Sequence, residues 1–478
     1  MASSGAPNIA ARLDRLPSTR VIWAMVALLA FGAFFEIWDI SLTSFMSPML
    51  VKAGIFHKGA KGMFGLSDQA TFAACTFAGL WIGTLIFSFI ADRLGRRPIF
   101  AVSLVWYCLA TVIMGLQNSA AMVDLWRFIA GVGIGVQLVA IDCYLAELMP
   151  KRLRGRAFAI STVIQFTANP MCAFLALALA PHGLFGIAGW RWLAFVPALG
   201  AAGVWFVQRS LPESPRWLAE HGFELKADAI VSDMERRSEI ALRAPLPSPE
   251  PSEGPSAAAD RQGLSSLLRP PLRARFYMMI GFQLLQTIGY YGFSNWVPSL
   301  LEARGVNLKD SLAYSGAIAL TFPLAPLIFY SFADRIERKW QITAGALGAA
   351  VFGLIFAQQS AAAGWIVFGV LTAFSGNLMS YGYHTYQSEL FPTRIRARAV
   401  GITYSFSRLS AIFSSFIIAY LLENGGVPSV FVFISGSLLG VAVIIGLFGP
   451  RTRNRSLEDI VRAEPARLAS ALETINAR

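Results

Sequence analysis

The stretch E-L-M-P-K-R-L-R-G-R-A at residues 147–157 occurs a second time, as E-L-F-P-T-R-I-R-A-R-A at residues 389–399. A shorter stretch, A-D-R-L-G-R-R at 91–97, occurs again as A-D-R-I-E-R-K at 333–339. In both cases the second copy begins 242 residues after the first. Two separate motifs with one offset indicate that the chain consists of two duplicated halves, an architecture found in membrane transporters.

The composition excludes a soluble enzyme and a disordered chain. Of the 478 residues, 55% are hydrophobic and only 14% are charged, whereas a soluble domain carries about 25% charged residues. Apolar runs long enough to cross a bilayer as helices recur twelve times. They lie at 20–50, 68–91, 99–118, 121–149, 157–180, 187–208, 275–301, 311–333, 340–358, 363–390, 397–421 and 427–449.

These runs predict an all-α polytopic membrane protein with twelve transmembrane helices in two pseudo-symmetric six-helix bundles. The proline-rich run at 243–263 separates the halves and is typical of a linker. The predicted layout is an N-terminal tail, the first bundle, a cytoplasmic linker, the second bundle and a C-terminal tail, at 1–19, 20–208, 209–274, 275–449 and 450–478.

The positive charges predict the orientation. The net charge is +12, which in a soluble protein would suggest nucleic-acid binding. Here 32 of the Lys and Arg residues fall in the tails and loops of one side, and six fall on the other side. Because positive loops stay in the cytoplasm, we expect a multi-pass protein of the plasma membrane with both termini inside and no nucleic-acid partner.

Two acids and one arginine lie within the predicted first and fourth spans. Glu36 and Asp39 are three residues apart and share a helix face. Asp39 lies about 28 Å along its helix from the cytoplasm and Arg127 about 9 Å from the outside, depths that allow them to pair. Protonation of Asp39 could then be coupled to rearrangement around Arg127, which predicts proton symport; the alternative is a static ion pair.

Arg408 lies about 16 Å into the eleventh span, and no acid in that helix neutralises it. Guanidinium binds carboxylates through two parallel hydrogen bonds, so we predict an organic anion as its partner. An acid on another helix or backbone carbonyls are the alternative partners. Asp142 is a candidate for proton coupling, and His384, at the equivalent position 242 residues later, is a candidate for substrate binding.

Polar and aromatic side chains follow one face of the seventh span and recur in the tenth. They suit a small polar solute with an apolar face, although hydrogen bonding between helices would explain them as well. The predicted substrate-binding residues of this group are Gln283, Gln286, Tyr290, Asn295 and Tyr383. Gly131, Gly133 and Gly135 in the fourth span predict close helix packing.

The duplicated motifs resemble those of the major facilitator superfamily. L-P-E-S-P-R-W-L at 211–218 resembles the signature of its sugar-porter-like branch, and R-F-I-A-G-V-G-I-G at 127–135 its helix 4 motif. The resemblance implies gating by charged residues at cytoplasmic helix ends, although these could simply anchor the topology. The residues concerned are Asp92, Arg93, Arg96, Glu147 and Arg154 in the first half, and Asp334, Arg335, Glu389 and Arg396 in the second.

A narrower resemblance concerns the substrate. The E-x-x-D spacing of Glu36 and Asp39 is similar to the D-G-x-D motif of aromatic acid:proton symporters, with Glu36 in place of the first Asp and Ile37 in place of the glycine. N-W-V-P-S-L-L at 295–301 also resembles that group. The same helix placement of an acid and an arginine occurs in proton-coupled sugar porters.

We therefore predict a secondary active transporter, acting as a monomer in the lipid bilayer, that carries a small organic carboxylate with protons by alternating access. Aromatic acids are one candidate class. A sugar or polyol symporter, an exporter or organic-cation carrier, and a receptor or channel are the alternatives. No nucleotide-binding loop, zinc motif or nucleophile elbow is present in the sequence, so we expect no cofactor, no metal and no enzymatic activity.

Overall fold

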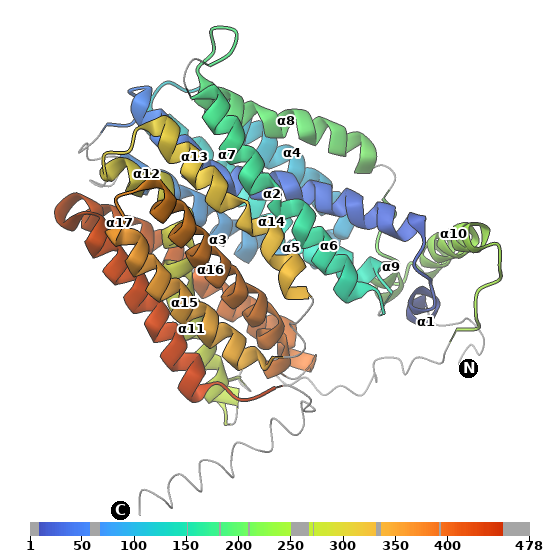
Figure 1. The fold of residues 1–478 in the computed structure, drawn as a ribbon. Helices are drawn as coiled ribbons and strands as arrows, with labels where there is room; N and C mark the ends of the chain where they lie inside the picture. The colour runs from blue at the N-terminus through green and yellow to red at the C-terminus, as the bar shows by residue number, and fades with distance from the viewer. Residues whose placement is uncertain are drawn as a thin grey trace, which may run out of the picture. The chain divides into compact units, whose positions relative to one another are not determined.

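The computed structural model describes residues 9–57, 67–150, 152–180, 183–208, 211–249, 267–270, 272–330, 336–391 and 393–452. Within these ranges the chain is almost entirely helical and contains no β-strand, which confirms the predicted all-α class (Figure 1). It divides into two compact units, Met1–Ala258 and Ala259–Arg478. The division falls within the segment 209–274.

The first unit contains seven helices in the region of the first six predicted spans. They are α2 (Arg20–Lys52), α3 (Asp68–Leu94), α4 (Arg96–Gly115), α5 (Ala120–Leu148), α6 (Arg154–Phe166), α7 (Ala168–Leu179) and α8 (Gly189–Gln208). The predicted span 157–180 is divided between α6 and α7 at Thr167. Proline explains the interruption, because the ring of Pro170 cannot fit against the carbonyl of Phe166 in a regular helix.

The second unit is interrupted in a similar way. Its elements are α11 (Leu272–Ser294), α12 (Val297–Ala303), α13 (Leu308–Ala319), α14 (Thr321–Tyr330), α15 (Arg338–Gln358), α16 (Ala362–Leu390), α17 (Thr393–Val443) and a π-helical turn (Ile444–Phe448). Pro298 follows the break between α11 and α12, and Pro323 follows the break between α13 and α14. The two last predicted spans lie in α17 and the π-helical turn. Residues on either side of Gly426, where the backbone is not helical and φ is 66°, form two separate helices within α17.

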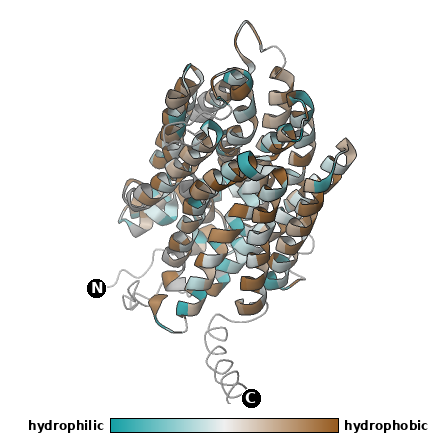
Figure 2. Cartoon of the chain, turned by 90° about the vertical axis from the view of Figure 1, so that its left-hand side faces the viewer, coloured by the Kyte–Doolittle hydropathy of each residue, from teal (hydrophilic) through white to brown (hydrophobic). Residues whose placement is uncertain are grey.

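The surfaces of both units are suited to lipid. Eight helices among the described residues are long and apolar enough to cross a membrane, and Figure 2 shows hydrophobic residues along most of the helical ribbon. Val102, Trp106 and Leu109 form an exposed apolar stripe on α4, with exposed fractions of 63%, 45% and 59%. Such stripes are expected where a helix faces hydrocarbon instead of water.

Helices α3 and α5 pack with their backbones in direct contact. A Cβ atom added at Gly83 would collide with the backbone oxygen of Val132, and one added at Gly135 would collide with that of Leu80. Gly131 likewise lies against the backbone of Thr76. The predicted close packing by glycines of the fourth span is thus confirmed for Gly131 and Gly135.

Substitution of Gly83 by alanine should lower the stability of the first unit by about 1–3 kcal/mol, because the backbone of α5 must move to admit the methyl group. The thermal unfolding midpoint of the purified protein measures the loss. Gly203→Ala in α8 is the matched control, since nothing lies within 4 Å of the added Cβ there. Equal midpoints for the two variants would contradict the packing described.

The segment 209–274, predicted as a linker, contains α9 (Pro215–Glu220) and α10 (Glu224–Leu242). A short helix of the N-terminal tail, α1 (Ile9–Asp14), lies beside α10 (Figure 1). Arg12 Nη2 donates to Glu235 Oε2 at 2.7 Å, and Arg15 Nη2 donates to Glu235 Oε1 at 2.6 Å. Of the predicted linker 243–263, residues 250–263 lie outside the described ranges.

The charges of this cluster lower the pKa of Glu235. Burial of the carboxyl acts in the opposite direction, but hydrogen bonds from Arg12 and Arg15 outweigh it. A carboxyl whose pKa is lowered on docking stabilises the docked state above its ordinary pKa, and this stabilisation is lost as the pH falls through the lowered value. The attachment of α1 to α10 should therefore be complete at neutral pH.

Glu235→Gln should weaken the attachment of α1 at neutral pH, because Arg15 loses its carboxylate partner and Arg12 keeps only Asp228. The protection factors of residues 9–14 against hydrogen–deuterium exchange should fall in this variant at neutral pH, and in the wild type they should fall only under acidic conditions. Asp233→Asn is the control, since Asp233 pairs with Arg236 and Arg237 on its own helix. Unchanged protection of 9–14 in Glu235→Gln would show that the ion pairs with Glu235 do not hold α1.

Candidate functional site

A fully buried ion pair joins α2 to α5 in the first unit. The side chains of Asp39 and Arg127 are both 0% exposed, and Arg127 Nη1 donates to Asp39 Oδ1. Arg127 Nη2 donates to the backbone oxygen of Asp39 at 2.7 Å and to the hydroxyl of Thr43 at 2.9 Å. Asp39 and Arg127 therefore form the ion pair that their predicted depths in the membrane allow.

Helices α3 and α4 complete the surroundings of this pair. Arg127 Nε donates to the hydroxyl of Thr76 at 2.8 Å, and the guanidinium lies 5.3 Å from the ring centre of Phe72. Thr111 donates to the second carboxylate oxygen of Asp39 at 2.5 Å. A buried ion pair is tolerated when its remaining donors and acceptors are satisfied, and these contacts satisfy them.

Glu36 and Asp142, which were also predicted to couple protons, lie on the two helices that carry this pair. Glu36 lies one turn before Asp39 on α2 and is 3% exposed. Asp142 belongs to α5, but its side chain lies outside the described residues. The coupling roles of Asp39, Glu36, Arg127 and Asp142 stay predictions.

The hydroxyls that surround Arg127 were missed by the sequence analysis. Thr43 lies four residues after Asp39 on α2, which is a helical spacing, and this is the one signal that could have indicated it. Thr76 and Thr111 lie on other helices, and the sequence contains nothing that distinguishes them from other threonines of apolar spans.

The second unit contains a buried arginine of a different kind. Arg408 on α17 is 2% exposed; its Nη1 donates to the hydroxyl of Tyr291 at 2.9 Å and its Nη2 to that of Tyr404 at 2.8 Å. Its guanidinium lies 5.0 Å from the ring centre of Tyr404. Among the residues that the structure describes, it forms no ion pair with a carboxylate. Tyr404, four residues before Arg408, could have been found from the helical spacing.

Further aromatic side chains lie beside this arginine. Tyr383 on α16 stacks on His384 with 4.2 Å between the ring centres, and His384 lies 6.3 Å from the ring of Tyr404. Tyr383 is buried whereas His384 is exposed. The structure thus gathers the predicted substrate-binding residues Arg408, His384 and Tyr383 within one cluster of the second unit.

The glutamines of α11 form a hydrogen-bonded network instead of an open polar surface. Gln283 donates to Gln387 on α16 at 3.2 Å, and Gln286 donates to Gln283 at 3.0 Å and to Thr287 at 2.9 Å. Gln283 is 0% exposed and Gln286 is 4% exposed. These are the contacts expected of the alternative interpretation, in which the amides hold helices together.

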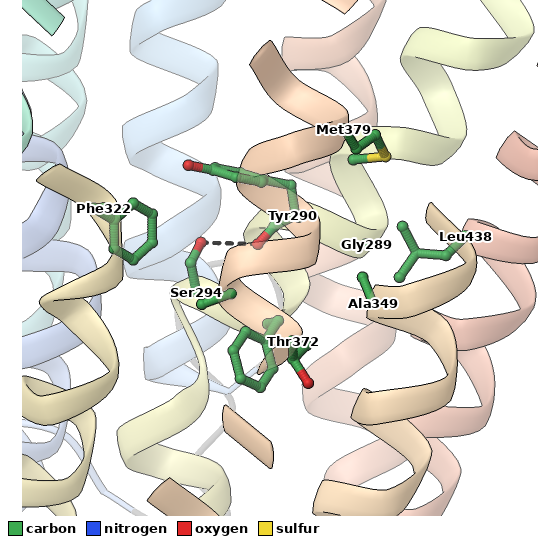
Figure 3. Close-up of a pocket in the computed structure, with 11 residues that line it drawn as sticks. Gly289, Tyr290, Ser294, Phe322, Ala349, Thr372, Met379 and Leu438 are labelled. Carbon is green, nitrogen blue, oxygen red and sulfur yellow. Dashed lines mark hydrogen bonds between the residues drawn. The ribbon is translucent and has the colours of Figure 1, made fainter. Parts of the chain in front are cut away.

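Tyr290 lines a small cavity of about 20 Å³ within the second unit, where its ring lies near Phe322 (Figure 3). The volume suffices for one water molecule and not for an organic solute. The Tyr290 hydroxyl lies 3.4 Å from the side-chain oxygen of Asn377. Asn295, also predicted to bind substrate, lies half-buried in the turn between α11 and α12.

The charged residues of the duplicated motifs form matching pairs at equivalent positions. Arg96 lies 3.0 Å from Glu147 in the first unit, and Arg338 lies 3.8 Å from Glu389 in the second. Arg154 begins α6. The side chains of Asp92, Arg93 and Arg396 are outside the described part of the chain, as are the residues Asp334 and Arg335. Gating by this group stays a prediction.

Glu213, which was not among the predicted site residues, completes the first of these clusters. Its Oε1 accepts hydrogen bonds from the backbone N–H groups of Arg96 at 2.9 Å and Arg97 at 3.2 Å, at the start of α4. A carboxylate at this place satisfies free N–H groups and the positive end of the helix dipole. The position of Glu213 within the motif at 211–218 could have indicated it as a functional residue.

Comparison with known proteins gives the family. The model of the sugar (and other) transporter family matches residues 25–463. The niacin transporter NiaP of Acinetobacter baylyi is 26% identical, over 95% of this chain and 99% of its own. The cis,cis-muconate transport protein of the same organism is also 26% identical, over 89% of this chain and 93% of its own.

The fold is that of a solved transporter. A partially occluded, inward-open structure of the xylose transporter XylE of Escherichia coli matches with a TM-score of 0.71 and 18% identity, over 91% of this chain and 99% of that one. The chain therefore belongs to the sugar (and other) transporter family of the major facilitator superfamily, and it is a multi-pass membrane transporter of small molecules and not an enzyme.

Proposed function

We propose that this protein is a secondary active transporter that carries a small organic carboxylate across the plasma membrane together with protons, by alternating access. We further propose that it acts as a monomer. Both termini should lie in the cytoplasm, since 32 Lys and Arg residues lie on the side of the tails and six on the other.

The observation that carries the substrate class is the environment of Arg408. A buried cation is costly unless an anion compensates it, and the partners of Arg408 among the described residues are two tyrosine hydroxyls. A substrate carboxylate would supply the missing charge through paired hydrogen bonds. The rings of Tyr291 and Tyr404 beside the guanidinium suit a solute that also has an apolar or aromatic part.

The relatives support the same class. Niacin and cis,cis-muconate, after which two relatives are named, are both carboxylates, and niacin is aromatic. A neutral sugar would leave the charge of Arg408 uncompensated, so this arginine favours an acid over a sugar. Nicotinate and muconate are therefore suitable first probes.

Arg408→Lys should raise the KM for nicotinate or muconate uptake into proteoliposomes about 10–100-fold, because a lysine cannot form the paired hydrogen bonds of guanidinium. Arg304→Lys is the matched control, since Arg304 lies at the end of α12 and donates to the backbone oxygen of Ala357. An unchanged KM in Arg408→Lys, with normal uptake in the control, would contradict the proposal that Arg408 binds the substrate carboxylate.

Proton coupling is supported by the Asp39–Arg127 pair. Protonation of Asp39 removes the negative charge that holds Arg127, so the ion pair has two states that differ by one proton. Because the pair joins α2 to α5 and also involves α3 and α4, a change of its state alters contacts between several helices at once.

Asp39→Asn should abolish uptake that is driven by a pH gradient while part of the exchange of labelled substrate persists, because the variant no longer binds the coupled proton. Both activities are measured in the same proteoliposomes with acidic or neutral outer buffer. Asp310→Asn, in the first turn of α13, should leave both unchanged. Gradient-driven uptake of normal size in Asp39→Asn would exclude Asp39 from coupling.

A further inference from the structure

Asp124 is a second buried acid near Arg127. It lies on α5, three residues before Arg127 and therefore on the same face of the helix. The residue is 1% exposed, and its Oδ1 has no hydrogen-bond partner among the described residues. Asp39 differs, since both of its carboxylate oxygens accept hydrogen bonds.

The groups around Asp124 do little to stabilise a negative charge on its carboxylate. Asp68, the first residue of α3, is 4% exposed, and its charge repels that of Asp124. Its Oδ2 accepts a hydrogen bond from the backbone N–H of His57 at 2.9 Å. Cys75, also on α3, interacts electrostatically with both Asp124 and Arg127.

The other titratable groups of this region lie around Asp39. Tyr107 and Cys108 on α4 and Cys172 on α7 interact electrostatically with Asp39, and Tyr107 also interacts with Glu36 on α2. On α2, Asp39 is the ion-pair partner of Arg127. The one positive charge close to Asp124 is thus already paired with another carboxylate in the described part of the structure.

An ionised carboxylate that is buried without partners is far less stable than its neutral form. We propose that Asp124 is a proton-binding site, and that it exchanges its proton with Asp39 while Arg127 changes partner. In the proposed cycle, Asp124 holds the proton while Asp39 is paired with Arg127. This inference rests on the proposed proton coupling and adds the residue that holds the proton while Asp39 is paired.

The exchange conserves charge and atoms. The O–H bond of Asp124 breaks, and an O–H bond forms on the carboxylate of Asp39, directly or through water. Arg127 leaves the now neutral Asp39 and pairs with the carboxylate of Asp124, which lies within reach one turn away on the same helix. The net charge of Asp39, Arg127 and Asp124 together is zero before and after the transfer. The cycle closes when Asp39 releases its proton to the solution on one side, Asp124 takes up a proton from the solution on the other, and Arg127 returns to Asp39.

Infrared spectroscopy of the purified protein in nanodiscs tests the site without any substrate. Aspartate labelled with ¹³C at its side-chain carboxyl separates the C=O stretch of a protonated Asp from that of Glu36. We expect such a shifted band at pH 7 in the wild type, its loss in Asp124→Asn and its persistence in Asp68→Asn. It should also be lost in Asp39→Asn, because Arg127 then has no ion-pair partner on α2 and pairs with the ionised Asp124. Asp124→Glu should move the band to the unlabelled position.

A band that survives in Asp124→Asn would overturn the proposal. So would a band that disappears in Asp68→Asn or persists in Asp39→Asn, and this arm remains decisive if Asp124→Asn does not fold. No band in the labelled wild type would also contradict it.

Proton uptake by proteoliposomes on addition of nicotinate or muconate tests the exchange itself. Asp124→Asn should slow this uptake at least about 10-fold, which corresponds to about 1.4 kcal/mol in the barrier, and Asp124→Glu should restore much of it. Unchanged coupled proton flux in Asp124→Asn would overturn the exchange. If the wild type carries no carboxylate with protons, the proposed function fails, whereas the infrared result still decides whether Asp124 binds a proton.

Discussion

The contact between Arg127 and Asp39 places two opposite charges in a region from which water is excluded, and the rest of the first unit has to make that placement tolerable. Separating such a pair, or removing one member, leaves a buried charge that costs about 3–5 kcal/mol. The surrounding hydroxyls of Thr43, Thr76 and Thr111 reduce this cost by filling the remaining hydrogen-bonding positions. The helices that carry these residues are consequently held in one relative arrangement for as long as the ion pair is intact.

The two halves share a scaffold but not their buried charges. The offset of 242 residues relates the pair Arg96–Glu147 to Arg338–Glu389. At the same offset, however, Asp39 and Arg127 correspond to Gly281 and Gly369, and Arg408 corresponds to Phe166. The charged helix ends are thus present in both halves, while the ion pair of the first unit and the tyrosine-bound arginine of the second have no counterpart at the equivalent positions. This asymmetry agrees with the proposed assignment of proton binding to the first unit and carboxylate binding to the second.

The sequence predicted what depends on composition and on spacing within a helix. Apolar runs predicted the all-α fold, and the depths of Asp39 and Arg127 along their helices indicated that the two side chains could pair, as they do. Contacts between distant segments were not predictable. Glu213 caps α4 from more than a hundred residues away, and the glutamines of α11 are bonded to one another and to Gln387, because partner choice is decided by packing. The prolines near the helix breaks did not predict them, since a proline inside an apolar run can also be accommodated by a kink.

The glycine contact between α3 and α5 determines which motions are available around Arg127. Since the two backbones touch without intervening side chains at Gly83 and Gly135, separating α3 from α5 would open a gap that no side chain fills, and we expect the two helices to move together. Thr76 on α3 then accompanies Arg127 wherever α5 goes. Asp39 and Thr43 on α2 are not attached in this way. The plane along which the bundle can shear therefore runs between α2 on one side and α3 and α5 on the other, directly through the ion pair.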